Sequence, residues 1–137
     1  MAVALEPHVA GELAEGTELD PSEHPPIVRR VVFALDTANA DDLVESFPVY
    51  LVRTRLAEEL IASGLTGFDV ADAVVVPGGP YLDLGHPLPP PTFRWLKVGR
   101  DSRADFCVSD AHLLVVSDRA YSLLSRWKLD LCDVHSA

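Results

Sequence analysis

Three side chains close together in the sequence could support catalysis. Cys107, Asp110 and His112 supply a thiol nucleophile, a carboxylate and an imidazole base within one short stretch. A small enzyme using these three residues is therefore one hypothesis. No G-x-S-x-G type motif flanks them, and Asp in a tight turn commonly bonds its own backbone. The alternative is that this stretch is simply a turn that precedes a strand.

A second pattern has the spacing of a zinc half-site. Cys132 and His135 form a C-x-x-H pair, for which His112 or Cys107 are conceivable partners. Zinc sites normally need two such pairs, whereas this chain has one. The alternative is that Cys132 is a buried structural thiol in a strand. We therefore predict no metal and no cofactor.

The net charge restricts the class of partner. The 137-residue chain carries a formal charge of −10, which argues against nucleic acid or an anionic membrane as the direct ligand. Phe93 and Trp95 are interleaved with a basic group, as in some single-strand binders, but strand alternation would place both aromatic rings in the core; the basic residues are Arg94, Lys97, Arg100 and Arg103. An acidic surface instead favours association with a basic protein. The alternative is that the acidity serves only solubility.

Two groups of residues are candidates for binding such a partner. The first comprises the acidic clusters, and the second is the segment 77–91, where six prolines and three glycines are expected to prevent helix formation. The predicted partner-binding residues are Asp41, Asp42, Glu45, Glu58, Glu59, Tyr81, Leu82, Asp83, Leu84 and His86. The alternative for the proline-rich segment is a rigid connector over a sheet edge.

An internal repeat indicates which elements position these residues. Residues 41–70 align without gaps on residues 105–134, an offset of 64 residues that matches Asp41 with Asp105 and Arg55 with Arg119. Each copy predicts a strand, a helix and a second strand. Thr54 in the first copy, and Ser117 or Asp118 in the second, stand where a helix N-cap is expected. The predicted apolar helix faces contain Leu56, Leu60 and Ile61 in the first copy, and Ala120, Leu123, Leu124 and Trp127 in the second.

The rest of the chain completes the predicted organisation. Residues 1–26 hold six acidic residues and no Lys or Arg, and we expect a loosely attached arm. Residues 27–137 are expected to form a single domain with a first strand at 27–35, an exit strand at 68–76 and a hairpin from 92–98 and 104–108. The predicted fold is α+β, with a mixed β-sheet and helices mainly on one face. No secretory signal or long apolar run is evident, so a cytoplasmic location is expected.

Two segments resemble a known group of proteins. YLVRTRLAEELIASGLTGFD, from Tyr50 to Asp69, and LVVSDRAYSLL, from Leu114 to Leu124, are similar to stretches in bacterial polymorphic-toxin immunity proteins. The resemblance implies an inhibitor that neutralises a cognate toxin by tight binding, without catalytic residues. A scaffold or accessory subunit of a larger complex is the first alternative, and the small enzyme is the second. The oligomeric state stays open.

Overall fold

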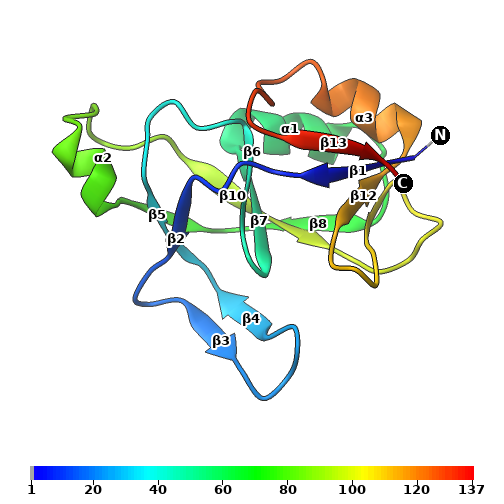
Figure 1. The fold of residues 1–137 in the computed structure, drawn as a ribbon, viewed down its shortest axis with the longest axis horizontal. Coiled ribbons are helices and arrows are strands. Elements are labelled where there is room, and N and C mark those ends of the chain that lie inside the picture. The colour runs from blue at the N-terminus through cyan, green and yellow to red at the C-terminus, as the bar shows by residue number, and fades with distance from the viewer. Residues whose placement is uncertain (1) are drawn as a thin grey trace.

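The computed structural model describes residues 2–137, which form thirteen strands and three helices (Figure 1). In chain order these are β1 (Val3–Glu6), β2 (Gly11–Leu13), β3 (Glu18–Asp20), β4 (Ile27–Arg30), β5 (Val32–Leu35), β6 (Leu43–Ser46), β7 (Val49–Arg53), α1 (Thr54–Ala62), β8 (Phe68–Ala71), β9 (Val74–Pro77), α2 (Gly79–Asp83), β10 (Phe93–Val98), β11 (Phe106–Val108), β12 (Leu114–Val116), α3 (Asp118–Leu124) and β13 (Asp133–Ser136). The predicted α+β class is confirmed.

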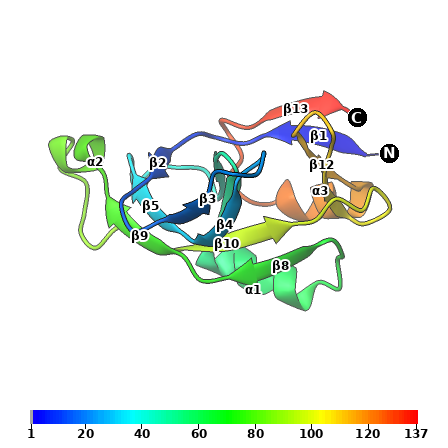
Figure 2. The same cartoon turned by 90° about the horizontal axis from the view of Figure 1, so that it is seen from below.

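The strands form four small sheets, whereas the sequence suggested one mixed sheet. Two sheets have four strands, in the orders β6-β7-β10-β8 and β11-β12-β1-β13. A three-stranded sheet, β2-β5-β9, contains the parallel pair β5 and β9, and β3 with β4 makes a separate ribbon. The ribbon projects from the body, and α2 lies at the end of the long axis opposite both termini (Figures 1 and 2).

Both repeat segments fold as the same succession of elements. A hairpin (β6-β7 or β11-β12), a helix (α1 or α3) and a last strand (β8 or β13) follow one another in each copy. In each sheet a strand from outside the copy lies between the hairpin and the last strand: β10 in the first, β1 in the second. Leu96 of β10 pairs with Tyr50 of β7 on one side and with Val70 of β8 on the other. In the second copy, Leu5 of β1 pairs in the same way with Leu114 and Val134, which lie 64 positions after Tyr50 and Val70.

The repeat register slips by one residue in the hairpin. Leu43 pairs with Val52, while Phe106 pairs with Val116, so the first hairpin is one residue shorter than the second. The ungapped alignment therefore matches the second strands, helices and last strands correctly. At the first strand of each hairpin the alignment is displaced by one residue. Asp105 directly precedes β11, and the residue that directly precedes β6 is Asp42, not Asp41.

The N-terminal segment is part of the body, so the expected loose arm is wrong for its first half. β1 pairs with β12 on one side and β13 on the other, and Ala4 and Leu5 are buried. β2 then pairs with β5. The acidic residues of this segment therefore lie on strands and turns of the fold.

The sheet β6-β7-β10-β8 separates two hydrophobic cores. Strand alternation sends Tyr50 and Leu96 into a core shared with α1, α3 and β12. Leu51, Phe93 and Trp95 enter a second core with β5 and α2, which confirms the expectation that both aromatic rings are core residues. Because β7 is buried on both faces, its first four residues are all apolar instead of alternating with polar ones.

Helix α1 meets the shared core through a face that differs from the predicted one. Leu56, Ala57 and Leu60 are buried, whereas Ile61, expected on this face, is 61% exposed. One helical step of about 100° carries Ile61 past the contact surface. Arg53 is the N-cap of α1, and no side chain caps this end, so Thr54 does not have the predicted role. Ser117 does cap α3, accepting a hydrogen bond from the Ala120 amide.

Three further expectations are corrected. The exit strand predicted over 68–76 divides into β8 and β9, which belong to different sheets. The predicted hairpin of 92–98 with 104–108 does not form, because β10 pairs with β7 and β8 while β11 pairs with β12. The proline-rich segment contains a helix, α2, since Pro80 occupies its first turn, where a missing N–H costs nothing.

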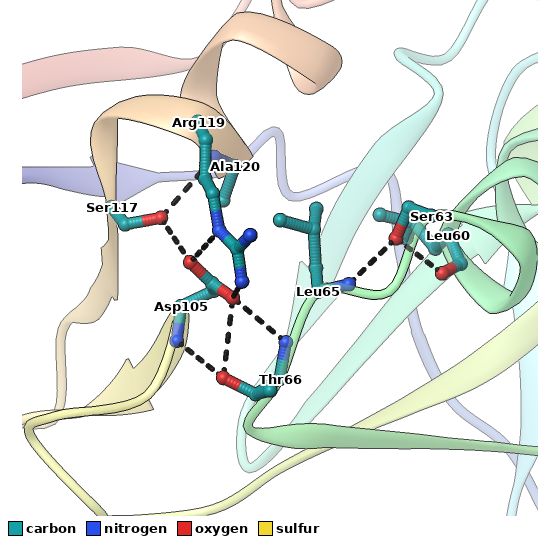
Figure 3. Close-up of polar contacts among 8 residues, drawn as sticks. All are labelled: Leu60, Ser63, Leu65, Thr66, Asp105, Ser117, Arg119 and Ala120. Carbon is teal, nitrogen blue, oxygen red and sulfur yellow. Dashed lines mark hydrogen bonds and ion pairs between the residues drawn. The ribbon is translucent and has the colours of Figure 1, made fainter.

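One buried carboxylate joins the two copies (Figure 3). Asp105 precedes β11 and accepts hydrogen bonds from the Ser117 hydroxyl at 2.7 Å and the Thr66 amide at 2.9 Å. Arg119 donates through Nε at 2.8 Å and Nη2 at 2.7 Å. These donors hold the pKa of Asp105 well below its usual range, with Arg119 the largest cause. The loop after α1 and the start of α3 are thus fixed to one side chain.

Candidate functional site

The proline-rich segment forms a projecting structure that we call the tip, defined as residues 79–88. Gly78 is the N-cap of α2, and the Leu84 amide donates to the Pro80 carbonyl at 3.1 Å to close its turn. Gly85 follows with a φ of +67°, a left-handed conformation that glycine adopts without strain. The chain therefore reverses immediately after the helix and returns toward the body.

Tyr81 anchors the tip to the second core. Its side chain is completely buried, and its hydroxyl donates to the Pro87 carbonyl, so one residue bonds the outgoing and returning parts of the tip. The His86 ring lies 5.0 Å from the Tyr81 ring, and His86 Nε2 is 3.3 Å from the Thr37 hydroxyl. Together these contacts fix the tip in one conformation relative to the core.

The anchored tip exposes three large apolar side chains. Leu82, Leu84 and Leu88 are 53%, 69% and 63% exposed. Asp83 is the one acidic residue of the tip and is exposed beside them. An exposed apolar patch of this kind is a common feature of protein-interaction surfaces. Of the tip residues predicted for binding, Leu82, Asp83 and Leu84 face solvent, His86 is half-buried and Tyr81 is buried.

The predicted acidic clusters are largely engaged inside the protein. Asp41 is fully buried and accepts from the Leu131 amide at 2.8 Å, while its Oδ1 atom has no hydrogen-bond partner among residues 2–137. Asp42 accepts from the Lys128 amide at 2.7 Å. Glu45 is half-buried, and its burial raises the pKa of its carboxyl group. Asp41 and Asp42 thus bond to the segment after α3, and with the half-buried Glu45 they do not form a solvent-facing patch.

The two acidic residues of α1, Glu58 and Glu59, differ in their contacts and exposure. Glu59 accepts from Arg126 at 2.6 Å and from the Trp127 indole at 2.9 Å, which ties α1 to the segment after α3. Glu58 is exposed. Among the five acidic residues of the clusters outside the tip, Glu58 is thus the one exposed to solvent.

The proposed catalytic residues face different depressions of the surface. Cys107 and Asp110 line a depression beside β11 and β12. His112 lines a different one, with Phe47 and Pro48. Burial raises the pKa of the Cys107 thiol, which lowers its thiolate fraction. This arrangement does not bring a nucleophile and its base together.

His112 instead belongs to an aromatic cluster that the sequence did not indicate. Its ring centroid lies 5.7 Å from that of His24 and 6.1 Å from that of Phe47. The cluster borders a cleft of about 140 Å³ whose lining includes Pro25 and Pro48. The three rings come from the ribbon loop, the β6-β7 turn and the loop before β12, and no local pattern links such distant positions.

The C-x-x-H pair is used within the fold. His135 Nε2 lies 2.5 Å from Glu6 Oε2, across the β1-β13 pairing. Burial raises the pKa of Cys132 to about 11, which disfavours the thiolate that a metal requires. Among residues 2–137, no three His, Cys, Asp or Glu side chains converge so that they could hold a metal ion.

Comparison with known protein families, with curated proteins and with solved structures finds no match to this chain. Within residues 2–137, none of the helices has the length and apolar character required to cross a membrane. Within the described residues, the tip brings three exposed leucines together on one anchored segment.

Proposed function

We propose that this protein acts by binding another protein through the tip, as an inhibitor that neutralises a cognate toxin in the manner of bacterial immunity proteins. The observation that carries the proposal is the exposure of Leu82, Leu84 and Leu88 on a scaffold anchored by the buried Tyr81. The resemblance of the α1 and α3 segments to immunity proteins supplies the inhibitor class.

The physical basis is apolar burial with little loss of conformational entropy. Burying a largely exposed Leu contributes about 1 to 2 kcal/mol, and the contacts of Tyr81 have already fixed the backbone that presents the three leucines. The charge of −10 adds long-range attraction toward a basic partner, which accelerates association and weakens with added salt. The partner that fits is a protein with an apolar pocket in a basic surface.

The first experiment is capture of the partner by the tagged chain and by matched variants. Leu84→Ser and Leu88→Ser each remove an apolar side chain from the tip. Ile61→Ser is the control, because Ile61 is 61% exposed but lies on α1. We expect the wild type and the Ile61 variant to retain a stoichiometric protein that the tip variants lose. Equal capture by all four chains would show that the tip is not the binding surface.

The second experiment tests inhibition. The captured protein is expressed in bacterial cells with the wild-type chain or with Leu84→Ser. We expect growth with the wild type and growth arrest with the tip variant. Growth without the chain would contradict the toxin proposal.

An accessory subunit of a larger assembly is the second candidate, favoured by the apolar character of the tip. Such an assembly contact would depend little on salt, because apolar burial rather than charge would dominate it. Recovery of a multi-subunit complex whose affinity for the chain is unchanged between low and high salt would replace the inhibitor by this alternative.

A further inference from the structure

A second candidate site lies at the start of α1, away from the tip. A cleft of about 250 Å³ is lined there by Asp42, Arg53, Thr54, Arg55, Thr92 and Trp127. We call it the α1 cleft. Its walls come from β7, α1, the segment before β10 and the segment after α3, so it exists only in the folded chain.

Two guanidinium groups in this cleft have no carboxylate at ion-pair distance within residues 2–137. The Arg53 guanidinium carbon lies 5.6 Å from the Phe93 ring centroid, and Arg55 is exposed. Elsewhere in the chain Arg94, Arg103, Arg119 and Arg126 each pair with a carboxylate. The hydroxyls of Thr54 and Thr92 lie 2.7 Å apart and add polar groups to the same lining.

The second copy of the repeat shows what occupies the corresponding place. Arg119 corresponds to Arg55 at the repeat offset, and it binds the Asp105 carboxylate through two nitrogen atoms. The same carboxylate accepts from Ser117, the residue that caps α3. In the second copy, therefore, a carboxylate from the chain itself neutralises the arginine at the start of the helix.

The first copy has the counterpart of Asp105 but places it differently. Asp42 directly precedes β6, and its carboxylate accepts from the Lys128 amide at 2.7 Å instead of pairing with Arg55. No side chain caps α1, and no acidic residue stands in its first turn. Counting Arg53, Arg55 and Asp42, the cleft keeps a net charge of +1 within a chain of charge −10.

From these contacts we infer that the α1 cleft binds a carboxylate group of another molecule, with Arg55 as its principal donor. The planar guanidinium matches a carboxylate in the two-bond geometry that Arg119 and Asp105 display in the other copy. The N-terminal end of the α1 helix dipole favours the same charge. This inference does not depend on the tip or on the identity of its partner.

The test is titration of the full chain with sodium acetate, with the ionic strength held constant by sodium chloride. Binding is followed by the NMR shifts of the Arg55 and Leu56 amides and of the Trp127 indole. We expect saturation with a dissociation constant of about 1 to 10 mM, as befits so small a ligand. Sodium phosphate, titrated in the same way, distinguishes a carboxylate site from a phosphate site.

Three variants make the assignment specific. Arg55→Gln should weaken acetate binding about five- to tenfold. Asp42→Asn, whose amide oxygen can still accept from Lys128, should strengthen it about two- to threefold because a repelling charge is removed. Arg30→Gln is the control for Arg55→Gln, because it changes the net charge by the same amount at an exposed residue of β4. It should leave acetate binding unchanged.

Several results would overturn the inference. These are no saturable shift, saturation by phosphate but not acetate, or equal weakening in the Arg55 and Arg30 variants. Circular dichroism of each variant establishes that it is folded before titration. If Arg55→Gln does not fold, Arg55→Lys provides the test: it keeps the charge but not the planar fork, and it should still weaken acetate binding.

Discussion

Replacing Asp105 by Ala should destabilise the protein more than replacing its partner Arg119 by Gln. Asp105 is 6% exposed and accepts from Thr66, Ser117 and Arg119. The substitution leaves the Thr66 amide and the Ser117 hydroxyl without an acceptor at a part-buried site. It also removes the side-chain link between the loop after α1 and the start of α3 (Figure 3), while the backbone bonds of Phe106 to Thr66 and of Ser117 to residue 105 remain.

The magnitude follows from the burial of each lost partner. A hydrogen bond to a charged group contributes about 1.5 to 3 kcal/mol, and the bonds from Thr66 and Ser117 are only part-buried, so we expect a loss of about 2 to 4 kcal/mol for Asp105→Ala. Arg119 has a side chain that is 65% exposed, and water can solvate its guanidinium when the carboxylate is absent. Arg119→Gln should therefore cost clearly less than Asp105→Ala.

The measurement is urea unfolding at pH 7, followed by circular dichroism and tryptophan fluorescence. Asp101→Ala is the matched control, because Asp101 also pairs with an arginine, Arg103, but at the exposed surface. We expect the control to match the wild type closely. A loss below about 1 kcal/mol for Asp105→Ala, or a larger loss for Arg119→Gln, would refute this account of the network.

The same residue gives a pH dependence of defined sign. The folded-state pKa of Asp105 lies well below the ordinary value of 3.8, so the carboxylate contributes its stability above that value. The contribution is lost as pH falls from about 4 toward the lowered pKa. The difference in unfolding free energy between the wild type and Asp105→Ala should thus be largest at neutral pH and narrow below pH 4.

Two further predictions test the tip anchor and the thiol of Cys132, which directly precedes β13. Tyr81→Phe keeps the buried ring but removes the hydrogen bond to Pro87, so we expect a loss of about 1 kcal/mol in urea unfolding and faster amide exchange at Gly85 and His86; unchanged exchange would show that this bond does not hold the tip. Because the pKa of Cys132 is raised from 9.0 to about 11, its thiolate at pH 8 is about a hundredfold scarcer than in the unfolded chain. Its alkylation by iodoacetamide, measured by mass spectrometry, should slow by about that factor relative to urea-unfolded protein, and equal rates would contradict the burial of this thiol.

The elements that the sequence predicted best are those whose signals are local. The run of apolar residues in β7 and the helical spacing of Leu56 and Leu60 specify a strand and a helix without knowledge of partners. Pairing was not accessible in this way. β1 inserts between β12 and β13, more than a hundred residues away, and nothing in its four residues distinguishes a central strand from a loose arm.

The same difference between local and long-range contacts applies to the candidate binding residues. Leu82 and Leu84 are exposed together because neighbours in a short turn remain neighbours in space. The acidic residues at 41, 42 and 59 looked like surface charge, yet each bonds a backbone amide or a side chain beyond residue 125. The amide partners leave no mark on the sequence. The charges of these residues could therefore be read from the sequence, but their burial could not.

The two copies of the repeat differ in a way that separates stability from binding. In the second copy, Asp105 neutralises Arg119 and Ser117 caps α3, so that its helix start is complete within the chain. In the first copy, α1 begins uncapped beside Arg55, and the segment after β8 continues through β9 into the exposed tip.

It follows that equivalent substitutions in the two copies should have different consequences. Changing Ser117 or Asp105 removes contacts on which the fold depends, and the effect should appear in unfolding. Changing Arg55 or Leu84 removes side chains that face solvent, and the effect should appear in binding while the unfolding free energy stays nearly constant. If Arg55→Gln destabilised the chain as much as Asp105→Ala, both copies would be structural, and the α1 cleft would be a consequence of packing alone.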